Sequence, residues 1–114
     1  MIGDIESKAG QPLSGDGIES VVKRLLLGPA DGWQGWAMRL FELAPGGHTP
    51  RHRHPWPHIN YVTAGRGTLY VDGVDNAVAA GSFAFVPAGA LHQFSNAGDD
   101  PFAFLCIVPE EGES

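Results

Sequence analysis

The sequence predicts an all-β fold, either a sandwich of two sheets or a small barrel of the jelly-roll type. Its 114 residues include 16 Gly and 9 Pro spread along the whole chain, which disfavours long helices. The apolar fraction is 43%, with three Trp, two Tyr and six Phe, so a folded core is favoured over disorder. Short apolar runs recur at intervals of about ten residues between turn signals, as in sandwiches and barrels. The length allows one domain.

The first half of the chain holds two expected strands. An apolar run over residues 21–27 stops at Gly28-Pro29, and a second run over 36–43 stops at Pro45-Gly46-Gly47. Glycine and proline interrupt regular strands, so both stops mark turns. Residues 48–57 contain three prolines and no apolar periodicity, which indicates a loop.

The second half is denser in strands. Asp72-Gly73 lies between two short runs and is a strong signal for a two-residue hairpin. Pro109 ends the last run, because proline cannot continue a hydrogen-bonded ladder. The expected strands here cover residues 59–64, 68–71, 74–79, 82–86, 91–95 and 102–108.

The two ends differ from the middle. Residues 1–18 are polar and glycine-rich and predict a flexible N-terminal arm, with at most a short strand near residues 2–5. Residues 19–109 form the predicted barrel, and residues 110–114 an acidic C-terminal tail.

Composition excludes several classes of function. Seven basic residues against 13 acidic ones give a net charge of −6, which argues against a nucleic-acid surface. No apolar run reaches 18 residues, and the N-terminus lacks the pattern of a signal peptide. The only cysteine, Cys106, excludes an internal disulfide. A cytoplasmic protein that binds neither nucleic acid nor membrane is the expectation.

Histidines are the most informative residues. His52 and His54 are two positions apart, so on an extended chain their imidazoles share one face, roughly 7 Å apart. His58 follows after a turn rich in proline, and His92 begins a distant strand. Clustered imidazoles suit transition metals. The alternative is a solvated histidine pair, and His48 is expected to be an ordinary loop residue.

Two spaced motifs sharpen this picture. Gly46-x5-His52-x-His54-x3-His58-x6-Gly65 resembles the first motif of the cupin family, G-x5-H-x-H-x3,4-E-x6-G, with His58 in place of the glutamate. Gly81-x5-Pro87-x-Gly89-x2-His92-x3-Asn96 matches the second motif, G-x5-P-x-G-x2-H-x3-N. The resemblance covers about residues 20–109, and the motif glycines fall at strand ends where a positive φ or a close backbone approach is expected.

The resemblance implies a double-stranded β-helix, the jelly-roll cupin barrel. It also implies that His52, His54, His58 and His92 hold one divalent transition metal ion per chain. The most similar members are small single-domain bacterial cupins with four histidine ligands, commonly reported with manganese. Manganese is therefore the first choice, although imidazoles also accept Fe, Ni, Zn, Co and Cu. A closed structural zinc site is the competing interpretation.

A pocket is expected around this ion. Phe94 lies two residues after His92 and so shares its face, and relatives place residues such as Phe104 and Cys106 in the cavity. Trp56 is expected at the mouth, while Asn60 and Tyr61 are candidates for hydrogen bonds to the ligands. Arg39, a lone charge in an apolar run, points either inward to an anionic group or outward to solvent.

Three functions remain open at this point, of which the first is favoured. The first is a metal-dependent oxidoreductase of the dioxygenase type that acts on a small organic substrate, with no general base identified. The second is a non-catalytic module that binds a small ligand or a metal. The third is a metal-assisted isomerase or lyase acting on a carbohydrate-like or oxo-acid substrate. A homodimer is expected, in which the arm before Gly17 adds a strand to its neighbour.

Overall fold

The computed structural model describes residues 1–113, and their regular structure consists of strands and single-turn 3-10 helices. The strands are β1 (Gln11–Leu13), β2 (Glu19–Leu27), β3 (Trp36–His48), β4 (His58–Ala64), β5 (Arg66–Val71), β6 (Val74–Ala79), β7 (Phe83–Val86), β8 (His92–Ser95) and β9 (Phe102–Pro109). The 3-10 helices are η1 (Ile5–Ser7), η2 (Pro29–Asp31) and η3 (Glu110–Gly112).

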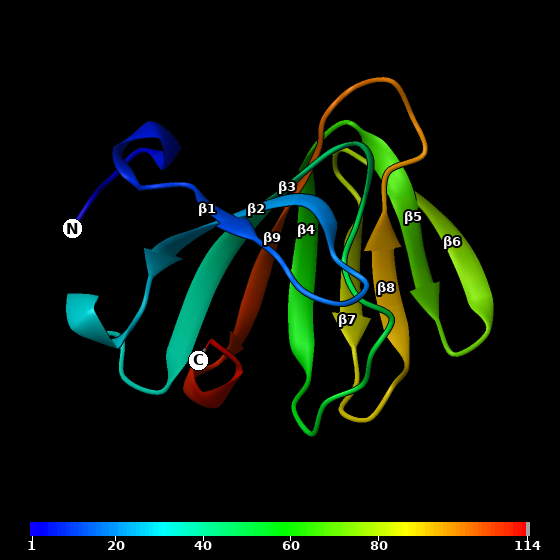
Figure 1. Ribbon diagram of the computed structural model, residues 1–114. Helices are drawn as coiled ribbons and strands as arrows, with labels where there is room; N and C mark the ends of the chain where they lie inside the picture. Colours follow the sequence, from blue (N-terminus) through cyan, green and yellow to red (C-terminus); the bar gives the residue numbers. More distant parts are fainter. Residues whose placement is uncertain (114) are drawn as a thin grey trace.

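One nine-stranded sheet curls so that its two halves face each other (Figure 1). The strand order is β6-β5-β8-β3-β9-β4-β7. Outside this order, β2 pairs with β3, and β1 pairs with β2. The 13-residue strand β3 takes part in both halves: it pairs with β9 along Trp36–Leu43 and with β8 only at His48. The all-β jelly-roll barrel predicted from the sequence is confirmed.

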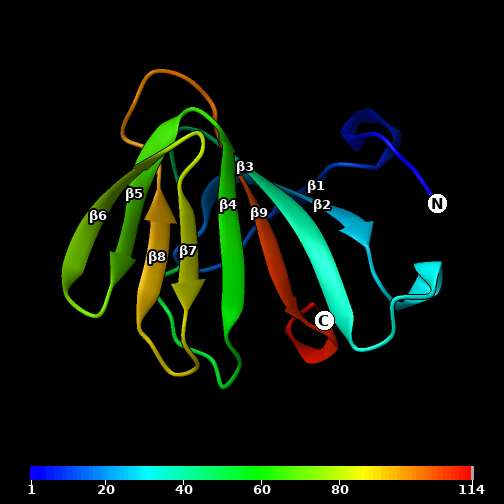
Figure 2. The same ribbon diagram turned by 180° about the vertical axis from the view of Figure 1, so that it is seen from behind.

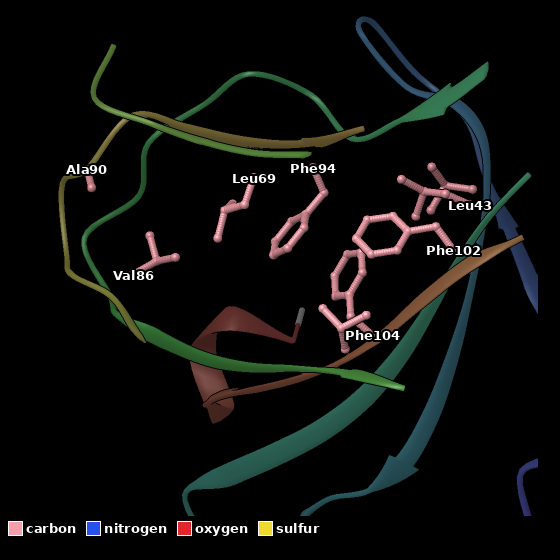
Figure 3. Packing of buried hydrophobic residues seen from close by; sticks show 9 residues of the cluster. Leu43, Leu69, Val86, Ala90, Phe94, Phe102 and Phe104 are labelled. Carbon is pink, nitrogen blue, oxygen red and sulfur yellow. The ribbon is translucent and has the colours of Figure 1, made fainter. Parts of the chain in front are cut away.

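Aromatic side chains fill the space between the halves. Phe94 of β8 stacks on Phe104 of β9 with ring centroids 3.9 Å apart, and Phe102 lies 5.4 Å from Phe104. All three are buried, and Figure 3 shows their rings pointing toward one another between the strands. Each such pair contributes about 0.5–1.5 kcal/mol beyond the burial of apolar area.

The N-terminal segment differs from the expectation in its local structure. The prediction of a short strand near residues 2–5 is wrong, because the 3-10 helix η1 covers Ile5–Ser7. The strand of the N-terminal segment is β1, further along the chain. β1 pairs antiparallel with β2 of the same chain, with Leu13 opposite Val21. Pro12 is tolerated because β1 is an edge strand and needs no second partner. Strand exchange with a second copy stays a prediction.

Strand β3 also runs further than the sequence predicted, past Pro45-Gly46-Gly47 to His48. Gly46 has φ 83° and donates its N–H to the carbonyl of Asn96 at 2.8 Å. A Cβ on Gly47 would lie 2.9 Å from three backbone oxygens. The two glycines therefore bend the strand instead of ending it, and the bend carries β3 from one half of the sheet to the other.

No helix in the described part of the chain combines the length and the hydropathy that a membrane-crossing helix requires.

Gly65→Ala is expected to destabilise the fold far more than Gly81→Ala. Both glycines have a positive φ, 73° and 96°, which costs a non-glycine residue about 1–2 kcal/mol. Only at Gly65 would a Cβ overlap a backbone atom, the carbonyl oxygen of Pro101, whereas nothing lies within 4 Å at Gly81. Urea denaturation should show an additional loss of about 1–3 kcal/mol for Gly65→Ala. Equal losses for the two variants would contradict this account.

Candidate metal centre

Four histidines converge at one end of the barrel. His52 and His54 lie in the segment of residues 49–57 between β3 and β4, while His58 and His92 are the first residues of β4 and β8. In both views this segment, the turn before β8 and η3 lie at the same end of the barrel (Figures 1 and 2). His52 and His92 exchange two backbone hydrogen bonds, of 3.1 and 2.9 Å. These bonds bring the two motifs together.

The imidazoles surround a common point. The ring of His92 lies 4.8 Å, centroid to centroid, from each of the other three. The ligand nitrogens of His52, His54 and His92 all lie within 4.8 Å of one another. Nε2 of His58 lies 3.2 Å from Nε2 of His92. His48, at the end of β3, does not belong to this group; its Nδ1 faces the carbonyl of Thr49.

Hydrogen bonds fix the tautomer of three of these rings. Nδ1 of His54 donates to the carbonyl of Trp56 at 2.8 Å, and Nδ1 of His92 to that of Ala90 at 2.9 Å. Nδ1 of His58 donates to Oδ1 of Asn60 at 2.5 Å. The amide of Asn60 donates in turn to the carbonyl of Leu105, which sets its orientation. Each Nε2 is therefore left with a lone pair, the usual arrangement behind metal-binding imidazoles.

These residues fit a divalent transition metal ion. Neither Nε2 of the His58–His92 pair carries a proton in this tautomer, so the two lone pairs face each other at 3.2 Å with nothing to bond them. Two imidazoles bound side by side to one ion at about 2.1 Å would hold their nitrogens about 3.0 Å apart. A cation between them removes the repulsion, and the all-nitrogen donor set suits transition metals.

Burial favours the neutral form of three of these rings. It lowers the pKa of His52 to about 4, with smaller contributions from His92 and His54. Burial also lowers the pKa of His58 to about 3, although its hydrogen bond to Asn60 acts in the opposite direction, and burial lowers the pKa of His92. Because a metal binds only the neutral ring, protons compete little for these nitrogens at neutral pH.

A cavity of about 300 Å³ opens beside the histidines. Trp56 lies at its wall and stacks on the ring of His54 with centroids 4.8 Å apart. Five of the residues predicted around the pocket line it: Arg39, Trp56, Phe94, Phe104 and Cys106. Its remaining walls are largely apolar. No carboxylate is among the described residues that line it.

Of the two residues predicted to hydrogen-bond the histidine ligands, only one contacts them. Asn60 is buried and contacts His58, as described above. Tyr61 is not brought to the cavity, because side chains alternate along β4 and its own points to the outer face, where it is 47% exposed.

Sequence reasoning missed the walls formed by the ends of the chain. Leu13 and Ile18 line the cavity from the N-terminal side, and Gly112 lines it from η3. Gly112 packs so closely on Trp56 that a Cβ there would lie 2.7 Å from the indole nitrogen. Polar, glycine-rich and acidic ends carry no periodic signal that would have revealed these contacts.

Known proteins share the sequence pattern and the fold of this chain. A family model described as a cupin domain matches residues 39–108. Over 90 residues the chain is 36% identical to 1-methylthio-D-xylulose 5-phosphate methylsulfurylase of Rhodospirillum rubrum. That match covers 79% of this chain but only 57% of the relative, so the chain spans little more than half of that protein.

Solved structures are similar over most of the fold. The polyketide cyclase RemF of Streptomyces resistomycificus superimposes with a TM-score of 0.90 at 27% identity, over 96% of this chain and 79% of that one. A sugar phosphate isomerase of the cupin superfamily from Silicibacter pomeroyi gives a TM-score of 0.79 at 28% identity, over 93% and 73% of the two chains.

Metal is expected to stabilise the protein through this cluster. At free metal a hundred times Kd the gain is about 2.7 kcal/mol, which corresponds to a rise in Tm of roughly 10 °C for a chain of this size. Chelator should remove that rise. His54→Ala should abolish the response to chelator, while His48→Ala, a histidine outside the cluster, should keep it. Melting curves of metal-loaded protein that chelator leaves unchanged would count against the site.

The metal-free protein is expected to lose stability as the pH falls from about 6.5 toward 5. In the unfolded chain the histidines take up protons near their usual pKa of about 6.5, whereas folding lowers the pKa of His52 to about 4 and of His58 to about 3. Each group that takes up a proton only in the unfolded state lowers the free energy of unfolding by up to about 1.4 kcal/mol per pH unit. Urea denaturation across this range measures the slope, which His58→Gln should reduce and His48→Gln should not. A flat profile would be the contrary result.

Proposed function

The chain belongs to the cupin family, and from that premise we propose that it is an enzyme dependent on one divalent metal ion. The ligands would be His52, His54, His58 and His92, with manganese as the first metal to test. Its reaction would be an isomerisation, cyclisation or elimination at the carbon next to a carbonyl of a small hydroxy-carbonyl substrate. The observation that carries the proposal is the neutral character of the ligand set.

Four imidazoles leave the formal +2 charge of the ion uncompensated, unlike a set that contains a carboxylate. When bound, such an ion polarises carbonyl and hydroxyl oxygens and stabilises negative charge that develops on them. His58 occupies the position at which the first cupin motif has its acidic ligand, so this chain departs from the motif in the charge of its ligand set.

The protein's own residues orient the histidine ligands and limit the access of water to the cavity. Asn60 and the carbonyls of Trp56 and Ala90 hold three rings with Nε2 toward the cluster. The aromatic rings of Phe41, Phe94 and Phe104 line the cavity and limit the entry of water, which strengthens electrostatic interactions inside it. Because no carboxylate is among the described lining residues, we assign proton transfer to a water molecule admitted with the substrate.

Similarity supports this class of reaction. The methylsulfurylase, the cyclase and the isomerase named above carry names that describe transformations other than oxygen incorporation. A dioxygenase-type oxidation is the second candidate, since the aromatic walls of the cavity also suit an apolar substrate held beside an ion. A metal-binding module without turnover would share the same site.

Proton exchange in D2O separates these functions. Manganese-loaded protein incubated with ketose phosphates of about three to five carbons should incorporate deuterium at the carbon next to the carbonyl, because the polarised carbonyl acidifies that C–H bond. NMR measures the exchange. Chelator and His54→Ala should abolish it, and His48→Ala should retain it.

Removing oxygen should leave the exchange unchanged. Turnover that requires oxygen would favour the dioxygenase instead. Metal binding with no turnover of either kind would favour the binding module.

A further inference from the structure

We infer that Arg39 binds an acidic group of the substrate, a carboxylate or a phosphate, and that the Glu113 carboxylate pairs with Arg39 in its absence. The inference rests on the proposed function in taking the cavity beside the four histidines as the substrate site. It names the substrate class of that site: a small anion that offers oxygen atoms to the metal and a separate acidic group to Arg39.

Arg39 is a buried charge in the wall of this cavity. It lies on β3 opposite Cys106 of β9, and both side chains line the cavity. Only 9% of its surface is exposed, and its guanidinium lies 4.9 Å from the centre of the Phe41 ring. Among the described lining residues it is the only arginine, and no lysine lines the cavity.

The guanidinium is poorly partnered for a buried cation. Its Nε has no hydrogen-bond partner. Nη2 donates to the sulfur of Cys106 at 3.1 Å, and Nη1 faces the carbonyl of Gly112 at 3.3 Å and Oε1 of Glu113 at 3.4 Å. Charged hydrogen bonds between arginine and a carboxylate are normally about 2.7–2.9 Å long. A buried charge is costly without a close counter-ion, so this side chain has capacity for an oxyanion.

Glu113 is bound more closely to another cation. Its Oε2 accepts a hydrogen bond from Nζ of Lys23 at 2.9 Å, whereas its contact with Arg39 is 3.4 Å. A ligand oxyanion that reaches Nη1 of Arg39 from the cavity would replace the longer contact. Glu113 would keep its pair with Lys23, so η3 need not leave its place on Trp56.

Charge complementarity favours an anion over a neutral ligand. Metal-bound, the cavity would hold an uncompensated ion and Arg39, with no acidic side chain among the described lining residues. One carboxylate, that of Glu113, is shared between Arg39 and Lys23. An anionic substrate supplies the missing negative charge.

Calorimetric titration of the manganese-loaded protein with inorganic phosphate and with acetate tests the inference, with glycerol as an uncharged control. Arg39→Met should weaken binding of the preferred anion about tenfold to a hundredfold, and Arg39→Lys should recover part of it. Glu113→Gln, which removes the competing charge, should tighten binding severalfold. Glu110→Gln, the same charge change on the exposed part of η3, should leave it unchanged. The tighter-binding anion identifies the acidic group as phosphate or carboxylate.

Equal affinities of the wild type and Arg39→Met, or weaker binding by Glu113→Gln, would overturn the inference. Should Arg39→Met fail to fold, the comparison of Glu113→Gln with Glu110→Gln decides alone. Titration of the chelator-treated protein separates this result from the fate of the proposed reaction. Anion binding that depends on Arg39 without metal supports the inference even if no turnover is found. Binding that needs the metal but not Arg39 contradicts the inference and leaves the metal site intact.

Discussion

The two backbone hydrogen bonds between His52 and His92 are the contact on which the site depends. They join an otherwise irregular segment to the start of β8. Thr49 continues the connection: its N–H donates to the carbonyl of Phe94, and its hydroxyl accepts from the N–H of Phe94. Without this short ladder His52 and His54 would lie on a loop with no fixed distance to His92. The site is therefore a product of barrel closure rather than of any single segment.

The burial of the histidine rings and of Arg39 determines which charges the site can bind. Burial favours neutral imidazoles at His58 and His92. The lone pairs of His54, His58 and His92, oriented by carbonyl and amide acceptors, favour a bound cation. On the same side of the sheet Arg39 is a buried cation whose Nε has no partner and whose carboxylate contact is 3.4 Å long, so it favours a bound anion. A metal ion would therefore bind the histidine lone pairs, and an acidic substrate would pair with the charge of Arg39.

Much of this site could be predicted from the sequence because the spacing of its histidines, glycines and proline along the chain is characteristic. The interval between His52 and His54, and the glycines and proline around His92, fix local conformation. Alternation along the strands also placed Phe94 in the cavity, and it shows why Tyr61 turns away while Asn60 does not. What could not be predicted depends on tertiary contacts between distant segments. Nothing local indicates that Gly112 would pack on Trp56 or that Glu113 would reach Lys23.

The proposed reaction and its substrate site both depend on one metal ion bound by the four histidines. Crystals of the full chain grown with manganese, measured at a wavelength where that metal scatters anomalously, would locate it directly. We expect one strong anomalous peak per chain within bonding distance of the Nε2 atoms of His52, His54, His58 and His92. A peak on other residues, or none at the cluster in protein shown to contain manganese, would contradict it.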